Sequence, residues 1–327
     1  VPVHFDYTQT VANPEYNPLD PDILMKDDLD SYTSEAAKDS LKQASQEFTE
    51  NTSINFINVR KDRTGATKKP KVYDIENFNV SYAYSTMYSR NIDIEYEKAK
   101  EHRGGIGYNF STAPKNVRPF ERIGFISKTS AFKLIKDFNF YYLPKSFSFT
   151  TDMIKLYGEN KLRNKSFGLV KITPTFVKKW DWNRNFNLRY DFSKGLSVDF
   201  NAQTKAYFNE APGSNDPNSE FYDEEANEEI NISDQFWKGG IKDMYTQTFN
   251  VNYKIPIDKI PIFDWIASNL TYQANYTWRA SPLSIQATQG NQIENSNSIQ
   301  FNNNLNFDNL YGKSRYLKDL TRKNRGQ

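Results

Sequence analysis

The sequence predicts an all-β protein built as an antiparallel sheet with one apolar face and one polar face. Phe, Tyr and Trp number 24, 21 and 5 among the 327 residues, an aromatic content too high for a disordered chain. The mean hydropathy is nonetheless −0.79, so polar residues accompany the aromatic ones closely. The two kinds of residue alternate with a period of two, which places each kind on its own face of a strand.

Composition also excludes several classes of protein. The 42 basic and 40 acidic residues nearly cancel, which argues against nucleic-acid binding through neutralised phosphates. The chain has no cysteine, so disulfide scaffolds and cysteine-based metal sites are excluded. A transmembrane helix needs about 18 consecutive apolar residues, and no run in the sequence approaches that length.

The clearest alternation runs through residues 185–208. It is interrupted by Ser193-Lys194-Gly195, which predicts a three-residue hairpin loop whose glycine takes a left-handed backbone. Pairing Tyr190 with Val198, and Phe192 with Leu196, keeps every apolar side chain of this hairpin on one face. Further alternation predicts strands at 78–84, 92–96, 106–110, 138–142, 147–151, 249–255, 270–278 and 299–307. Roughly ten to twelve strands are expected in all.

Strand length and loop length favour a transmembrane β-barrel segment over a soluble sandwich. The strands run to about ten residues, as in barrels that cross a membrane. Tight turns are predicted at Leu143–Ser146 and Ser193–Gly195, and long polar loops at 155–179 and 209–240, which is the loop asymmetry of outer-membrane barrels. The side chains expected to face lipid are Phe186, Leu188, Tyr190, Val198, Phe200, Phe249, Val251, Tyr253, Tyr272 and Tyr276. Those expected to face the lumen are Asn187, Arg189, Asp191, Asp199, Asn201 and Gln203.

The remaining segments divide the chain into four parts. Residues 1–13 are expected to form a strand, 14–51 a non-strand insertion, 52–311 the barrel wall, and 312–327 a basic non-strand tail. The insertion carries a helix at about 33–48, capped by Ser31 or Thr33. This helix is either a gating or partner-binding element or, as we favour, a loop helix packed on the barrel rim or wall. The chain opens without an initiator methionine and closes on basic residues, so we expect an internal piece of something larger.

The motifs that could carry chemistry have simpler explanations. Seven acidic residues between Asp216 and Glu229 could bind calcium, but they lack the spacing of an EF-hand loop, and a solvated extracellular loop is favoured. Arg103–Gly107 looks like a phosphate loop but leads into a strand, which favours a bulge or a close backbone approach. His4 and His102 are the only histidines and do not make a zinc site. No nucleophile elbow is present either. We therefore expect no enzyme activity, cofactor or metal.

Several longer strings resemble one family. They are Asn77–Tyr84, Arg90–Tyr96, Arg103–Tyr108, Pro114–Phe120, Asp137–Pro144 and Tyr253–Pro261. These strings are similar to those of the SprA/Sov family, the outer-membrane translocon of the Bacteroidota type 9 secretion system, which is also tied to gliding motility. The resemblance covers most of residues 75–311, and no catalytic residues come with it.

The resemblance implies that the chain is part of a very large barrel with a water-filled lumen that passes folded substrate proteins to the cell surface. It implies as partners the lipid bilayer, a PorV-type small outer-membrane barrel, a periplasmic plug protein, the secreted substrates and the rest of the same barrel, with no nucleic acid. The expected location is the outer membrane of a Gram-negative bacterium of the Bacteroidota. Two other hypotheses stay open, namely a small-nutrient transporter barrel and a soluble surface β-domain with binding loops.

Overall fold

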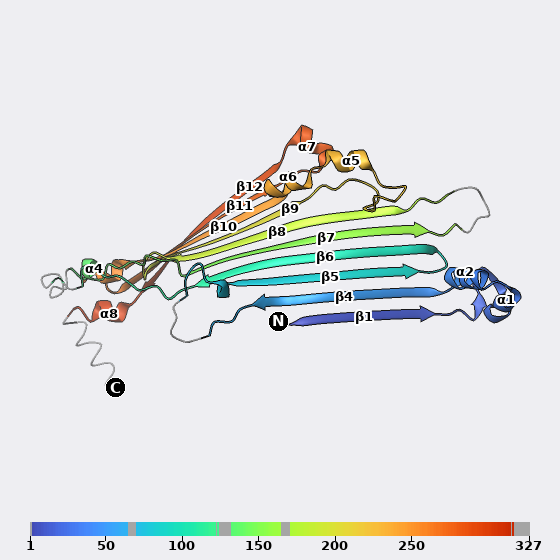
Figure 1. The fold of residues 1–327 in the computed structure, drawn as a ribbon. Coiled ribbons are helices and arrows are strands. Elements are labelled where there is room, and N and C mark those ends of the chain that lie inside the picture. The colour runs from blue at the N-terminus through green and yellow to red at the C-terminus, as the bar shows by residue number, and fades with distance from the viewer. Residues whose placement is uncertain are drawn as a thin grey trace.

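The computed structural model describes residues 2–64, 70–121, 123, 132–164, 171–314 and 316. Its main element is a ten-stranded antiparallel sheet in which neighbouring strands follow one another along the chain (Figure 1). The strands are β1 (Val3–Ala12), β4 (Glu47–Arg60), β5 (Phe78–Arg90), β6 (Ile94–Ser111), β7 (Ser146–Leu162), β8 (Thr175–Asp191), β9 (Leu196–Tyr207), β10 (Ile241–Ile255), β11 (Ile266–Arg279) and β12 (Gln292–Leu305). The all-β class is confirmed. Among the described residues the sheet is open, with β1 and β12 as its edges.

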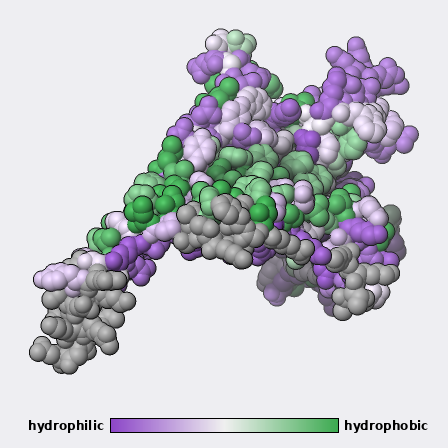
Figure 2. Space-filling view, turned by 90° about the vertical axis from the view of Figure 1, so that its left-hand side faces the viewer, coloured by the Kyte–Doolittle hydropathy of each residue, from purple (hydrophilic) through white to green (hydrophobic). Residues whose placement is uncertain are grey.

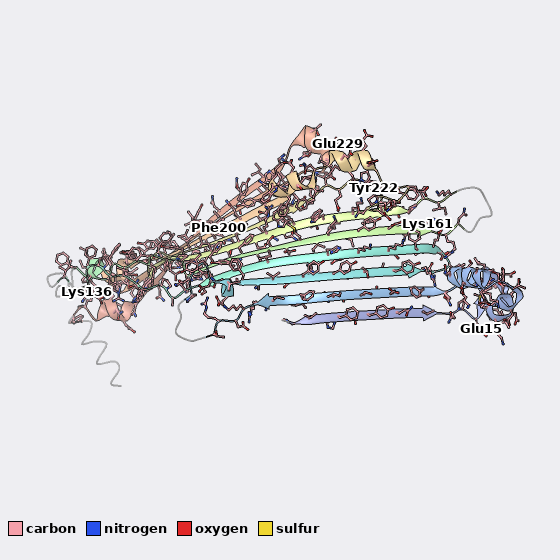
Figure 3. The ribbon with its side chains drawn as sticks, viewed as in Figure 1. Glu15, Lys136, Lys161, Phe200, Tyr222 and Glu229 are labelled. Carbon is pink, nitrogen blue, oxygen red and sulfur yellow. The ribbon has the colours of Figure 1, made fainter. Side chains whose placement is uncertain are left out.

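The other elements are short and lie at the ends of the strands (Figure 1). A two-stranded sheet joins β2 (Tyr16–Asn17) and β3 (Asp20–Leu24). The helices are α1 (Met25–Ser31), α2 (Glu35–Ser45), η1 (Ile75–Asn77), α4 (Lys133–Lys136), α5 (Glu224–Glu229), α6 (Ile232–Trp237), η3 (Pro256–Lys259), α7 (Leu283–Gln289) and α8 (Phe307–Tyr311). Figure 3 shows Lys161 and Lys136 at opposite ends of the strands, with Phe200 between them.

The alternating strand direction assigns each connection to one end of the sheet. The end that carries α1 and α2, here called the α2 end, holds the connections 13–46, 91–93, 163–174, 208–240 and 280–291. The opposite end, here called the α4 end, holds 61–77, 112–145, 192–195 and 256–265. The clean asymmetry of loop lengths predicted from the sequence is wrong, because a short turn and a long connection occur at both ends. The two loops predicted to be long do share the α2 end, opposite Lys194.

The insertion predicted at 14–51 is shorter and more ordered than expected. It contains the small β2–β3 sheet, and β4 begins already at Glu47. The first residues of β4 pair with Thr8–Ala12 of β1, so their backbone bonds are satisfied although their side chains give no apolar alternation. The helix predicted at 33–48 is α2, preceded by Ser34 and not capped by Ser31 or Thr33, and Leu41 is its buried apolar residue.

The strands β7 and β8 extend into the loop predicted at 155–179. β7 continues to Leu162 and β8 starts at Thr175, so the connection is only 163–174. The sequence gives no clear sign of this because apolar and polar residues do not alternate there: Leu156 is followed by Tyr157, and Phe176 by Val177. The loop predicted at 209–240 is present as a connection that contains two helices, α5 and α6. Most of the predicted tail at 312–327 lies outside the described residues.

The strand predicted at 138–142 is also wrong. This segment follows α4 and makes a single bridge, between Phe140 and Val117. The side chain of Asn139 donates to the Asp137 carbonyl, a local bond of the kind that competes with a strand ladder. It also accepts from the Lys194 amide in the β8–β9 turn. Leu143–Ser146 is consequently not a hairpin turn, and the whole of 112–145 connects β6 to β7.

The hairpin predicted at 185–208 is present as β8 and β9. Tyr190 pairs with Val198 and Leu188 with Phe200, in the predicted register. Gly195 does not have the positive φ expected of it. Instead, a Cβ at this position would lie 3.1 Å from the carbonyl oxygen of Lys254, whose amide donates to the Gly195 carbonyl over 2.7 Å. Glycine is needed here because β10 approaches the turn closely.

The glycine-rich string at 103–107 lies in the middle of β6. Its register with β5 and β7 is continuous, so the predicted bulge is absent. A close backbone approach is not seen at Gly104 or Gly107. At Gly107 the near neighbour is a side chain, since a Cβ there would lie 2.3 Å from the side-chain oxygen of Asn79.

Candidate functional site

The strand register separates the predicted site residues onto the two faces of the sheet. Cross-strand pairs such as Leu188–Phe200, Phe200–Phe249 and Val251–Tyr272 place all ten side chains predicted to face lipid on one side, here called the aromatic face. Pairs such as Asn187–Asn201 and Arg189–Asp199 place all six residues predicted to face the lumen on the other side, here called the polar face. What each face contacts stays a prediction.

Amides and hydroxyls cover the polar face and bond across neighbouring strands. The Asn187 amide donates to Ser148 over 3.1 Å, and the Thr271 hydroxyl donates to Asn252 over 3.2 Å. The Asn275 amide donates to Ser296 of β12 over 3.3 Å. These contacts continue from β7 to β12. The sequence could have located them, because the residues occupy every second position of strands whose alternation is clear.

Charged side chains on the polar face lie close to opposite charges. The Arg189 guanidinium lies 3.5 Å from Asp199 and 3.6 Å from Asp191, and Lys145 lies 3.6 Å from Asp191. Exposed pairs of this kind contribute only about 0–1 kcal/mol each to stability. Their main effect is on the surface potential, since this part of the polar face offers an incoming molecule no large field of one sign.

Apolar side chains form a band on the aromatic face, and neighbouring rings contact one another along it. The ring centroids of Phe149 and Phe186 are 4.7 Å apart, and those of Phe78 and Tyr108 are 4.9 Å apart. Such pairs contribute roughly 0.5–1.5 kcal/mol beyond the area they bury. In the described chain the band is uncovered toward its two edges, where Phe5 is 62% exposed and Ile299 is 69% exposed. The end-on view of Figure 2 shows hydrophobic surface over the middle of the molecule and hydrophilic surface on its projections.

The aromatic band crosses the strands obliquely. Residues that pair with one another across successive strands form a row, here called a hydrogen-bonded row. In an antiparallel sheet such a row runs perpendicular to the strands. The row through Phe5 in β1 reaches β8 at Trp180, by way of Ile54, Tyr84, His102 and Lys155. The row through Ile299 in β12 reaches β8 at Tyr190, by way of Tyr272, Val251 and Val198. Phe5 and Ile299 both belong to the band, yet their rows meet β8 ten residues apart.

This stagger corresponds to a definite tilt. Ten residues at a rise of ~3.4 Å span ~34 Å along the strands, and nine strand spacings of ~4.8 Å span ~43 Å across them. The band is therefore inclined by ~38° to the hydrogen-bonded rows, on the basis of these spacings. Strands of transmembrane barrels tilt by ~35–45° from the membrane normal, and a band at constant depth crosses their rows at the same angle.

At the α2 end, the connection 208–240 folds back onto the aromatic face. Phe208 lies against Trp180 and Trp182, with ring centroids at 4.6 and 5.9 Å, and Phe236 of α6 stacks on Trp182 at 5.3 Å. Lys155 pairs with Glu210 over 2.8 Å. Sequence reasoning missed this cluster, although the string Trp180-Asp181-Trp182 alternates like the other strands.

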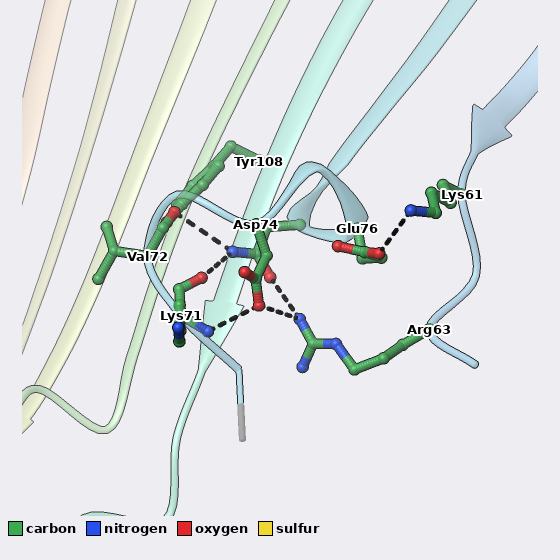
Figure 4. Close-up of polar contacts among 8 residues, drawn as sticks. Lys61, Arg63, Lys71, Val72, Asp74, Glu76 and Tyr108 are labelled. Atoms are coloured by element: carbon green, nitrogen blue, oxygen red, sulfur yellow. Dashed lines mark hydrogen bonds and ion pairs between the residues drawn. The ribbon is translucent and has the colours of Figure 1, made fainter. Parts of the chain in front are cut away.

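At the α4 end, polar contacts around Asp74 hold the connection 61–77 in place (Figure 4). Its carboxylate lies 3.2 Å from Arg63 and accepts the Lys71 amide over 2.8 Å. Tyr108 of β6, which is buried, donates its hydroxyl to the Val72 carbonyl over 2.7 Å. This cluster joins the connection to the aromatic face.

A cavity of about 770 Å³ lies beside the β8–β9 turn at the same end. Its apolar wall includes Phe138, Phe140 and Phe192, and its rim carries an ion pair of 2.8 Å between Asp137 and Lys259. Hydrogen bonding from Lys259 lowers the pKa of the Asp137 carboxyl below its ordinary value. This ion pair connects two of the loops at the α4 end.

The residues with potential for chemistry make structural contacts. The Nδ1 atom of His102 lies 2.9 Å from the Tyr82 hydroxyl, and its ring lies against Tyr84. In the acidic loop, Asp223 caps α5 and Glu220 pairs with Lys171. Over the part of the chain that the structure describes, no three His, Asp or Glu residues gather closely enough to hold a metal ion.

No protein-family model and no curated protein matches the chain. Among the described helices, none combines the length and the apolar character that crossing a bilayer would require.

Proposed function

We propose that this chain is a segment of the wall of a transmembrane β-barrel in an outer membrane, and that the barrel conducts folded proteins in type 9 secretion. The observation that supports the barrel is the oblique aromatic band, set opposite a face rich in polar residues. The type 9 assignment rests on the resemblance of residues 75–311 to the SprA/Sov family.

The inclination of the band is the strongest support for a bilayer as its contact. A bilayer presents apolar surroundings at a fixed depth, so tilted strands must shift their apolar residues from one strand to the next. A soluble domain would need a second layer over this face. Among the described residues, the connections that touch the aromatic face do so near its ends, through Trp182 and Tyr108.

The polar face suits the passage of large, varied substrates. Its amides and hydroxyls hold water, and the charges of Lys145 and Arg189 balance those of Asp191 and Asp199. A folded protein therefore meets few groups to which it would adhere. A small-nutrient transporter would instead need a specific ligand site on this face.

The two edge strands are where we place the rest of the barrel. β12 pairs with β11 over all 14 of its residues, and it carries one charged residue, Glu294, and no proline. Long edges without such protection pair readily with further strands. Strands of the same large barrel would continue the sheet at β1 and β12. The PorV-type barrel and the periplasmic plug are proposed as partners on the same resemblance.

The test is selective blocking of the polar face. The chain has no native cysteine, so Asn201→Cys and Phe200→Cys can be compared in the intact protein in cells. We expect a bulky water-soluble maleimide to react with Cys at position 201 and to slow surface appearance of a type 9 reporter. It should react poorly at position 200.

The control is Asn215→Cys in the connection 208–240, where the same reagent should react without slowing export. Equal reaction at positions 200 and 201 would contradict the membrane assignment. Full reaction at 201 with unchanged export would contradict the conduit.

A further inference from the structure

We infer that α6 is an interfacial anchor, with Trp237 in the headgroup region of the bilayer beside the aromatic face. This inference rests on the proposed membrane location and adds to it a defined contact and a defined depth. Trp237 is 84% exposed, more than any other large apolar side chain in the described chain.

The position of α6 is fixed by its contacts with β8. Phe236 stacks on Trp182 with their ring planes only 3° apart, and Trp237 lies edge-on to Phe236 at 5.7 Å. The Arg184 guanidinium donates to the Gly239 carbonyl over 2.7 Å, and Gln235 exchanges two hydrogen bonds with the Asn209 backbone. Trp237 is therefore exposed on an element held against the aromatic face.

The chain reversal after α6 depends on two glycines. Gly239 and Gly240 have φ values of 85° and 76°, which side-chain-bearing residues rarely adopt. A Cβ on Gly240 would lie 3.0 Å from the Cβ of Ala206 in β9. This close approach holds the end of α6 against the strands and restricts the positions that Phe236 and Trp237 can take.

The depth of α6 agrees with the interface of a bilayer. Leu188 is the middle residue of the band on β8, and Trp182 lies six residues farther along the strand. At a rise of ~3.4 Å and a tilt of ~38°, six residues correspond to ~16 Å along the membrane normal. The headgroup region of a bilayer extends from about 15 to about 21 Å from its centre.

Neighbouring residues on the same face include the aromatic types that are common at a membrane interface. The hydrogen-bonded row next to Trp182 contains Arg184, Tyr245 and Trp278 on the same face. Tryptophan and tyrosine favour the membrane interface because one part of each side chain is apolar and another is polar. Figure 3 shows Glu229 of α5 near the outer end of the connection 208–240. We therefore choose lipid, and not another protein, as the contact of Trp237.

Spin labels on single cysteines test the inference in the intact protein reconstituted in phosphatidylcholine vesicles. Labels at Trp237→Cys, Leu188→Cys and Glu229→Cys are compared by their accessibility to oxygen, which partitions into lipid, and to a water-soluble nickel chelate. We expect oxygen to dominate at position 188, nickel at 229, and intermediate values at 237.

The outcomes separate the inference from the proposed function. A label at 237 as accessible to nickel as the one at 229, with 188 still in lipid, would overturn the anchor only. Protection of 237 from both reagents would indicate a protein contact and would also overturn it. Nickel access at 188 would overturn the membrane location itself. Because a label could disturb α6, brominated lipids provide a second measurement, in which Trp237→Phe should reduce the quenched fraction of tryptophan fluorescence.

Discussion

Phe5 in β1 and Trp180 in β8 lie on one hydrogen-bonded row, although Phe5 is in the aromatic band and Trp180 lies beyond the band on its own strand. The band and the ladder of the sheet therefore follow different directions. Hydrogen bonding alone gives no reason for this difference, since the ladder would be the same for any distribution of side chains. A flat apolar environment that crosses tilted strands accounts for it.

The first prediction concerns arginine substitutions on the two faces. Leu188→Arg or Phe200→Arg should destabilise the assembled barrel by about 2–4 kcal/mol, because the charge would face the bilayer midplane. Asn187→Arg and Asn201→Arg are matched controls, since each lies next to its counterpart in the same pair of strands. The measurement is the amount of heat-stable, folded protein in the outer membrane. Equal losses on both faces would remove the membrane assignment.

The second prediction concerns the orientation of the two ends. The connections 163–174 and 208–240 should lie outside the cell, and Lys194 at the α4 end should lie in the periplasm. An impermeant thiol reagent applied to whole cells should label Asn215→Cys and leave Lys194→Cys unlabelled until the outer membrane is permeabilised. The opposite pattern would reverse the topology. Labelling of both on whole cells would contradict a membrane between the two ends.

The third prediction is that no single titratable side chain is essential for export. We expect export of type 9 substrates to stay largely intact in the variants Asp191→Asn, Asp199→Asn and His102→Gln. The reason is that the proposed conduit acts through the shape and the hydration of its lumen. Removing the strands β8 and β9 together should abolish export, since the barrel would have to close in another register or expose strand edges. The measurement is the amount of exported substrate, divided by the amount of folded barrel in the outer membrane. Loss of export from one substitution at normal barrel levels would indicate a specific site.

The sequence predicted the parts of the fold in which side chains alternate and failed where they do not. The hairpin at Tyr190 and Val198 was predicted in register because its apolar residues all share one face and its polar residues the other. At the α2 end, β7 continues through Lys155–Leu162 with polar residues on both faces. Periodicity vanishes there although the backbone ladder does not, so no pattern could have marked that strand.

Alternation also misled where no neighbouring strand pairs continuously with the segment. Phe138, Phe140 and Tyr142 have the spacing of a strand, yet in the described chain their segment makes an isolated bridge through Phe140 to Val117, and the Asn139 side chain adds further bonds. The separation of the site residues between two faces could be predicted because it depends only on parity. The oblique band could not, because its inclination requires the register of nine strand pairs, and register between distant strands is set by tertiary structure.

The last prediction concerns the pH dependence of the α4 end. Lys259 lowers the pKa of Asp137, so the pair stabilises the contact between the connections 112–145 and 256–265 while the carboxylate is ionised. A carboxyl with a lowered pKa contributes its full stabilisation above the ordinary value, near ~4. That contribution is lost as the pH falls through the lowered pKa.

We therefore expect Asp137→Asn to loosen this contact at neutral pH and to make no difference in strong acid. Both side chains are partly exposed, with relative exposures of 32% and 36%, so the effect should not exceed about 1 kcal/mol. Hydrogen exchange of backbone amides in residues 256–265 measures it as faster exchange in the variant at pH 7. Glu121→Gln is the matched control, because it removes the ion pair with Arg118 inside one connection and leaves the contact between the two connections in place. Faster exchange at 256–265 in the control as well, or a difference between wild type and Asp137→Asn that persists well below pH ~3, would show that the ion pair is not what holds these two connections together.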